Sequence, residues 1–316
     1  MSRNLLVRIA VAVPAIAGAV VVLWLGGWVL AAVLAVLGVL GTAEVYSFAK
    51  KQGIEPLEWV GFLAAAACPL ATYWVKTAAD WEPVVYAGAV WLLLGLLVAA
   101  ARGPARHPLT ALAVTLFGPL YASTLLSFIV AIRHGPHADA HPRGSVALVV
   151  MPLVITWVCD TCAMAVGTLV GGRKLAPVLS PRKTWSGAVG GVAGGLVAAL
   201  VYGPLVLDRV ALRLGAWQLV TVGLVVAVAA QVGDVAESLF KREVGVKDSS
   251  SLIPGHGGVL DRLDAVYFVA PVAAALFRLL DLAWASASRS SGLPDRSVAR
   301  RSRSWRASGS GSGSQP

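Results

Sequence analysis

The chain has 316 residues, of which 57% are hydrophobic and only 13% are charged, and its formal net charge is +10. A membrane-spanning helix needs about 20 predominantly apolar residues, and several such runs follow one another with short polar connections. Because no polar stretch between them is long enough for a soluble domain, the composition predicts an all-α polytopic membrane protein with one membrane domain.

Nine apolar runs are candidate spans. They cover residues 5–24, 26–48, 57–76, 83–101, 109–133, 145–171, 186–206, 216–240 and 264–286. The first two meet at Gly26 and Gly27, so they form either a tight hairpin or one continuous segment. Arg3 and Arg8 before an apolar stretch also fit a signal peptide. Because the apolar character continues past Leu40, we favour an uncleaved first helix.

We divide the chain into three regions. Residues 1–140 hold the N-terminal spans, residues 141–288 hold the polar motifs, and residues 289–316 form a basic tail rich in Ser, Arg and Gly. The composition of the tail predicts disorder, and its simplest role is attraction to anionic lipid headgroups. We expect no nucleic-acid partner, because no folded or aromatic-rich segment that could recognise nucleic acid accompanies the basic residues.

Glu44 lies inside the second apolar run, and an acid at membrane depth is costly without a partner. Two explanations stay open: a cation in a cavity pairs with Glu44, or Glu44 lies near the membrane interface.

Two groups of residues are of the types that bind metals. Cys68, Cys159 and Cys162 all lie in apolar runs, which argues against disulfides and favours small apolar packing, although the last two have redox or metal spacing. The second group follows the fifth run, and we favour a solvated loop because its spacing fits no tetrahedral site. It comprises His134, His137, Asp139 and His141.

A basic segment rich in hydroxyl groups follows the sixth run. It contains Arg173, Lys174, Ser180, Arg182, Lys183 and Thr184. Such side chains suit a polyphosphate, but ordinary positive charge on the cytoplasmic side of the membrane accounts for them equally well. Behind this segment, Gly187, Gly191 and Gly195 recur every four residues, which predicts close helix packing within the protomer or across a dimer.

The eighth run carries a polar stripe. Asp234, Glu237, Ser238 and Lys241 are spaced so that they share one face of a helix. Lipid would leave these groups unpaired, so the stripe must face the protein interior or a wet cavity. A buried Glu–Lys pair is the structural alternative, but the polar character continues beyond the stripe. We therefore expect a polar cavity within the membrane domain.

The loop after this run contains Gly255, His256, Gly257 and Gly258. Glycines permit unusual backbone angles and let amide groups approach a phosphate closely. Carboxylates from two different helices are also what Mg²⁺ prefers, with water and phosphate oxygens completing its shell.

The distribution of basic residues predicts orientation. With nine spans, the N-terminus and the loops after the second, fourth, sixth and eighth spans hold 14 Lys and Arg, against 5 in the opposite loops. The first side is therefore expected to be cytoplasmic. The same parity would leave the basic tail outside.

The segment from Ser238 to Asp264 resembles the signature of the phosphatidate cytidylyltransferases. The positions that match are Ser238, Lys241, Arg242, Lys247, Asp248, Pro254, His256, Gly257, Gly258, Asp261, Arg262 and Asp264. A second motif of this family resembles Asp160-Thr161 followed by Ser180–Gly187, and the chain departs from it at three positions. These are Cys162, Met164 and Ser186.

This resemblance implies an enzyme that joins CTP to phosphatidic acid, giving CDP-diacylglycerol and pyrophosphate. It also implies Mg²⁺, with room for a second cation, and a homodimer in a bacterial plasma membrane whose active-site cavity faces the cytoplasm. Metal ligands would be Asp234 and Asp261. Catalytic residues would be Asp160, Lys241, Arg242, Lys247, Asp248, His256, Arg262 and Asp264. Substrate contacts would be Ser180, Arg182, Lys183, Thr184, Glu237, Ser238, Gly257 and Gly258.

Two alternatives remain beside this interpretation. A cytidylyltransferase for another lipid phosphate, such as an isoprenoid-glycerol phosphate, would carry the same motifs. An ion-coupled transporter could use the polar stripe as an ion path, but it should spread polar residues over several helices and contain inverted repeats. Neither feature is found in the sequence, so the transporter is the weaker alternative.

Overall fold

The computed structural model describes residues 3–78, 80–135, 142–210, 212–253 and 257–290. The chain divides into two compact units, Met1–Ala274 and Ala275–Pro316. Helix α10 begins in the first unit and continues into the second. The tail that the sequence predicts to be disordered begins at residue 289, and all of it beyond residue 290 lies outside the described residues.

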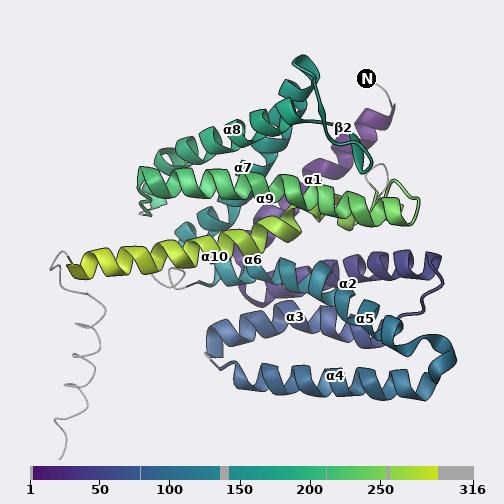
Figure 1. Cartoon of the computed structure of the whole chain (residues 1–316). Coiled ribbons are helices and arrows are strands. Elements are labelled where there is room, and N and C mark those ends of the chain that lie inside the picture. The colour runs from purple at the N-terminus through teal and green to yellow at the C-terminus, as the bar shows by residue number, and fades with distance from the viewer. Residues whose placement is uncertain (1–2, 79, 136–141, 211, 254–256, 291–316) are drawn as a thin grey trace, which may run out of the picture. The chain divides into compact units, whose positions relative to one another are not determined.

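Helices dominate the described residues. The first half of the chain contains α1 (Arg3–Leu25), α2 (Gly27–Lys51), α3 (Glu58–Ala78), α4 (Glu82–Arg102), η1 (Pro104–Arg106), α5 (Pro108–Pro119), η2 (Leu120–Thr124) and α6 (Leu125–Arg133). The second half contains α7 (Pro142–Leu169), α8 (Trp185–Tyr202), η3 (Gly203–Leu207), η4 (Asp208–Val210), α9 (Ala216–Glu243) and α10 (Leu260–Ser290). Figure 1 shows these helices as long rods joined by short connections.

The all-α polytopic fold expected from the apolar runs is confirmed, with nine as an approximate count. Within the described residues, seven helical stretches are long and apolar enough to cross a membrane. The predicted runs 5–24 and 57–76 are helical as α1 and α3, but neither is among the seven. The run 109–133 is one stretch built from α5, η2 and α6. Pro119 lacks an N–H to donate, and a π-helical turn follows it without ending the stretch.

The polar segment after the sixth run is a small hairpin and not an irregular loop. Strands β1 (Lys174–Ala176) and β2 (Ser180–Thr184) pair antiparallel, with Lys174 opposite Thr184 and Ala176 opposite Ser180. Thr184 then caps α8, because its hydroxyl oxygen accepts a hydrogen bond from the backbone N–H of Gly187 at 3.1 Å. The hairpin is therefore fastened directly to the start of a helix.

The glycines of α8 pack within the protomer, which answers one of the two options left by the sequence. An added Cβ at Gly191 would lie 2.9 Å from the Cβ of Ala163 on α7, and one at Gly195 would lie 2.7 Å from the Cβ of Ala227 on α9. Both distances are shorter than real Cβ contacts, so only a residue without a side chain lets α8 pack this closely against α7 and α9.

The N-terminal half has its own packed centre around Tyr46 of α2. Its side chain is fully buried, and its hydroxyl group donates a hydrogen bond to the carbonyl of Thr115 at 2.8 Å. Gly61 on α3 leaves the space for this ring, since an added Cβ there would lie 1.6 Å from the Tyr46 hydroxyl oxygen.

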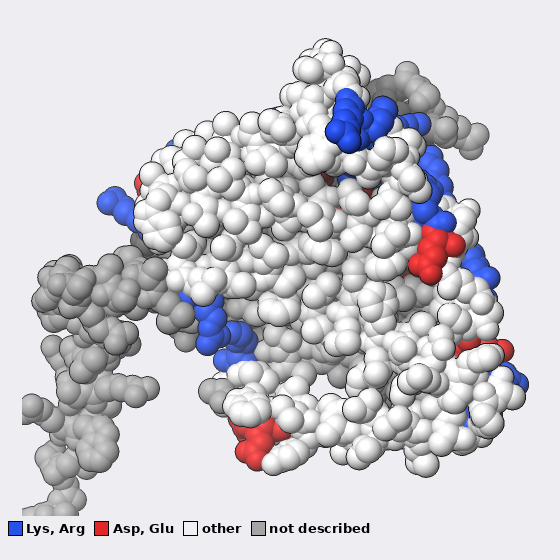
Figure 2. All heavy atoms as spheres, viewed as in Figure 1, with Lys and Arg blue, Asp and Glu red and all other residues white. Residues whose placement is uncertain are grey.

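Charged side chains are absent from most of the surface seen in Figure 2, where Lys, Arg, Asp and Glu lie mainly towards the edges and leave a broad uncharged area between them. Large exposed hydrophobic side chains on this kind of surface, such as Trp74, Leu93 and Val189, would be costly in water. They suit a bilayer, so the chain is an integral membrane protein.

The three cysteines, Cys68, Cys159 and Cys162, are free. Cys159 is buried against the carbonyl of Ala227, and the amide group of Gln231 lies 3.5 Å from its sulfur. Small apolar packing accounts for it.

Candidate active site

The polar stripe of α9 lies in the interior of the protein. Glu237 is fully buried, Ser238 is buried, and the side chain of Lys241 is only 12% exposed. The ammonium group of Lys241 lies 2.5 Å from Glu237 Oε2 and 2.8 Å from Asp261 Oδ1. One cation thus pairs with two carboxylates from different helices. An isolated buried Glu–Lys pair, the alternative left by the sequence, does not describe this cluster, because Asp261 also contacts Lys241.

Asp261, in the first turn of α10, is surrounded by donors. Its Oδ1 accepts from Lys241, while its Oδ2 accepts from the Ser249 N–H at 2.7 Å and the Gly258 N–H at 2.9 Å and also lies 2.9 Å from the Ser249 hydroxyl oxygen. The side chain therefore folds the loop back onto the helix that follows it. Both of its oxygens are engaged by the protein itself.

The glycines of this loop are explained by close packing. Gly257 has a φ of +82°, and an added Cβ would lie 2.5 Å from Asp261 Oδ2. An added Cβ at Gly258 would lie 2.1 Å from the Ser249 hydroxyl oxygen. The Gly258 N–H, expected from the sequence to face a phosphate, donates to Asp261 here. His256, Gly255 and Pro254 lie outside the described residues.

The hairpin meets α9 through two contacts. Lys183 on β2 lies 2.6 Å from Asp234 Oδ2, and both groups are partly buried. Arg242 donates from Nε to the carbonyl of Leu179 and from Nη1 to the carbonyl of Val246. The two motifs found in the sequence are therefore in contact across more than 50 residues of chain.

Three carboxylates lie near the Lys183 contact, each on a different helix. They are Asp160 on α7, Asp234 on α9 and Asp264 on α10, within electrostatic range of one another. Asp264 Oδ1 accepts a hydrogen bond from the Ala265 N–H at 2.7 Å. Among the described residues, no three His, Cys, Asp or Glu side chains converge closely enough to form a complete metal site.

The remaining predicted residues fall into two groups. Lys247, Asp248, Arg262 and Arg182 are exposed around the cluster, where a soluble substrate could reach them. Ser180 and Thr184 lie on β2, where the Thr184 hydroxyl serves as the cap of α8. Ser186, one of the three departures from the family motif, donates its hydroxyl to the carbonyl of Gly171 and closes the base of the hairpin.

Sequence reasoning missed the partners of Glu44. This side chain on α2 is only 5% exposed, and its carboxylate accepts four hydrogen bonds from residues 249–260. The donors are the hydroxyl groups of Ser249 and Ser250, both at 2.7 Å, and the N–H groups of Val259 and Leu260, both at 2.9 Å. The only signal in the sequence was an unpaired acid in an apolar run.

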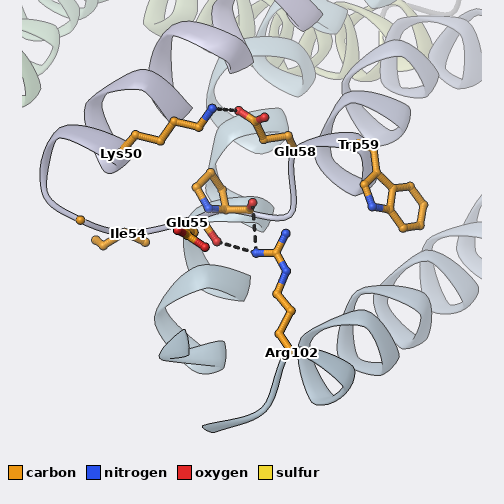
Figure 3. A pocket seen from close by; sticks show the side chains of 8 residues that line it. Lys50, Ile54, Glu55, Glu58, Trp59 and Arg102 are labelled. Carbon is orange, nitrogen blue, oxygen red and sulfur yellow. Dashed lines mark hydrogen bonds and ion pairs between the residues drawn. The ribbon is translucent and has the colours of Figure 1, made fainter. Parts of the chain in front are cut away.

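Two other polar regions stand apart from this site. A pocket of 460 Å³ lies at the α2–α3 connection, lined by Lys50, Glu58, Trp59 and Arg102 among others (Figure 3). Its charged side chains contact the protein itself: Lys50 pairs with Glu58, and Arg102 donates to the carbonyl of Glu55. No motif residue lines it.

His134, from the histidine group after the fifth run, accepts a hydrogen bond from the Gly27 N–H at 3.0 Å. His137, Asp139 and His141 lie outside the described residues, so the solvated loop stays a prediction.

Comparisons with known proteins match this geometry to a family. A model described as "Cytidylyltransferase family" matches residues 6–280. A phosphatidate cytidylyltransferase of Synechocystis sp. is 30% identical over 296 residues, which cover 84% of this chain and 94% of that protein.

Two further relatives carry the same name. The protein of Brucella suis is 46% identical over 123 residues, or 37% of this chain and 42% of that protein. The protein of Haemophilus influenzae is 39% identical over 156 residues, or 47% of this chain and 52% of that protein. The chain thus aligns with less than half of the length of the Brucella relative and with nearly all of the Synechocystis one.

Proposed function

The chain belongs to the cytidylyltransferase family, and from this premise we propose that it transfers a cytidylyl group from CTP to phosphatidic acid. The products are CDP-diacylglycerol and pyrophosphate. The observation that carries the proposal is the pairing of Lys183 with Asp234, because it joins the two family motifs inside a membrane-embedded polar cluster.

The chemistry is a substitution at phosphorus. A phosphate oxygen of phosphatidic acid attacks the α-phosphorus of CTP in line, the new P–O bond forms, and the bond to the β-phosphate oxygen breaks. No general base is needed, because the attacking phosphate is already an anion. Catalysis then depends on positioning the two phosphates and neutralising their charge.

The basic residues around the cluster suit this task. Lys183 on the hairpin pairs with Asp234, and Arg182 beside it in sequence is exposed. Lys247 in the loop and Arg262 on α10 are also exposed. In the proposed reaction they bind the triphosphate and the lipid phosphate. Lys241 acts differently: it is held between Glu237 and Asp261, so it keeps those carboxylates in place beside the substrates.

Mg²⁺ is proposed as the cofactor, and the acidic residues fit it in part. Asp160, Asp234 and Asp264 lie within electrostatic range of one another and offer hard oxygen donors. Mg²⁺ is commonly held by one or two carboxylates, with substrate phosphates and water completing its shell. Bound there, it would neutralise phosphate oxygens. Asp261, also predicted as a ligand, would have to exchange its contact with Lys241 first.

The location of the site follows from the basic loops. We propose a bacterial plasma membrane with the hairpin and the 244–259 loop facing the cytoplasm, supported by the excess of Lys and Arg on that side and by the bacterial relatives. A homodimer among membrane lipids stays part of the proposal. An ion-coupled transporter is not favoured, because the polar residues gather around one cluster shared by both motifs.

The direct test is an activity assay on purified protein. With CTP, Mg²⁺ and phosphatidic acid in detergent micelles, we expect a CDP-lipid by mass spectrometry and one pyrophosphate for each molecule formed. A parallel reaction with an isoprenoid-glycerol phosphate separates the two lipid substrates. If only the isoprenoid lipid gave a product, the proposed lipid substrate would be wrong. If neither lipid gave a product, the proposed function would be refuted.

A further inference from the structure

Glu44 connects two parts of the chain that are more than 200 residues apart. It comes from α2, in the N-terminal half, whereas all four of its donors come from residues 249–260. Each carboxylate oxygen accepts two bonds: Oε1 from Ser250 and Val259, and Oε2 from Ser249 and Leu260. This carboxylate is saturated by hydroxyl and backbone donors.

The contact with α10 has the chemistry of a helix cap supplied by another helix. The first N–H groups of a helix have no partner within it, and the helix dipole makes this end electropositive. Leu260 is the first residue of α10, and its N–H and that of Val259 both donate to Glu44. Among the described residues, no Lys or Arg forms an ion pair with Glu44, so these donors and the helix end stabilise its charge.

The contact reaches the candidate site through Ser249. Its hydroxyl group lies 2.7 Å from Glu44 Oε2 and 2.9 Å from Asp261 Oδ2, and the opposite oxygen of Asp261 contacts Lys241. A continuous polar chain thus runs from α2 to the stripe of α9. Gly258 leaves room for this chain of contacts, because an added Cβ there would lie 2.4 Å from both Glu44 oxygens.

We propose that Glu44 is a positioning residue for the transfer reaction. It holds Ser249, Ser250 and the first turn of α10 so that Asp261 and Lys241 keep the arrangement that substrates meet. The N-terminal helices thereby support the site although they contain no motif residue. The expected effect of Glu44 on catalysis rests on the proposed function, whereas its expected effect on the order of the loop does not.

The test compares two variants of one helix. Glu44→Gln keeps the size of the side chain but replaces an acceptor oxygen with a donating amide group. Tyr46→Phe is the matched control, because it removes one buried hydrogen bond of α2, to Thr115, without touching the loop. We expect Glu44→Gln to lower kcat by about 10- to 150-fold, the range for a lost bond to a charged group, while Tyr46→Phe keeps kcat near that of the wild type.

A second measurement does not depend on activity. Hydrogen exchange followed by mass spectrometry should be faster in residues 249–260 of Glu44→Gln and unchanged there in Tyr46→Phe. Glu44→Asp keeps the charge on a shorter side chain, so its kcat should lie between those of the wild type and Glu44→Gln. If Glu44→Gln does not fold, Glu44→Asp carries both measurements.

The outcomes separate the two proposals. A wild-type protein that makes no CDP-lipid refutes the proposed function but leaves the exchange experiment valid. Wild-type exchange in the 249–260 segment of Glu44→Gln would overturn the positioning role. So would an equal loss of kcat in Tyr46→Phe, because that would make the effect one of general stability.

Discussion

The two halves of this protein use buried space in opposite ways. Around Tyr46, the N-terminal half is held by apolar packing and single hydrogen bonds, and Gly61 is small because an aromatic ring occupies its place. Around Lys241, the second half buries three charged groups in direct contact, and its glycines are small because carboxylates approach them. Packing of the first kind stabilises a fold, whereas a buried network of charges is costly and marks a site that handles charge.

The largest effect is expected from Asp234→Asn, which tests whether the charges of the second half serve chemistry. A neutral amide is a poor replacement for a carboxylate that pairs with Lys183 and is proposed to bind Mg²⁺. We expect kcat/KM for CDP-lipid formation to fall by at least about 100-fold. Even mutation of a residue that only hydrogen-bonds to a metal ligand lowers metal affinity or activity by about 10–100-fold. Asp208→Asn, at an exposed acid on η4, is the control and should behave like the wild type. Near-normal Mg²⁺-dependent turnover in Asp234→Asn would remove this residue from the site.

Lys183→Ala should have the next largest effect. A charged contact to phosphate is worth about 1.5–3 kcal/mol, or roughly 10- to 150-fold in kcat/KM for CTP. Lys174→Ala makes the matched comparison, because Lys174 is an exposed lysine on the other strand of the same hairpin. Steady-state kinetics with each substrate varied in turn would measure both. Equal kinetics in the two variants would mean that Lys183 has no specific role in CTP binding and that the basic residues of the hairpin serve only to orient the protein in the membrane.

Gly61→Ala addresses the N-terminal half and should change stability more than catalysis. The new Cβ collides with the Tyr46 hydroxyl group, and such overpacking costs about 1–3 kcal/mol. Thermal unfolding in detergent should show a lower Tm, while the molecules that remain folded keep their kcat. Gly88→Ala on α4, where an added Cβ meets nothing within 4 Å, is the control. A large loss of kcat at unchanged Tm would mean that packing in the N-terminal half affects catalysis directly and not only stability.

The smallest effect is expected from deleting residues 291–316. This segment contains five Arg and no motif residue. Its removal should leave turnover in detergent unchanged and weaken attraction to anionic vesicles by about 1 kcal/mol for each basic residue near the surface. Assays in micelles and vesicle co-sedimentation would measure the two effects separately. An inserted truncation without activity would show that the tail takes part in catalysis.

Some of this architecture could be predicted from the sequence, because the signals were local. Apolar runs of sufficient length indicated the spans, and the spacing from Asp234 to Lys241 placed the polar stripe on one face. The hairpin was missed because β1 has only three residues, too few to show an alternating pattern.

The partners of Glu44 could not be predicted, since they lie more than 200 residues away and include two backbone N–H groups that no side-chain pattern reveals. The contacts of the loop glycines could not be predicted either, because a requirement for small residues does not say what occupies the adjoining space. The structure puts Asp261 next to Gly257 and Glu44 next to Gly258, and the phosphate contact of these glycines stays a prediction.

The glycines of α8 also tie the site to the packing of a helix that contributes none of its acids. With only hydrogen at Gly191 and Gly195, α8 lies against both α7 and α9, the helices that carry Asp160 and Asp234. A methyl group at Gly191 would collide with Ala163 of α7, and one at Gly195 would collide with Ala227 of α9. Either change would therefore shift a helix that carries one of these acids without altering any residue of the site.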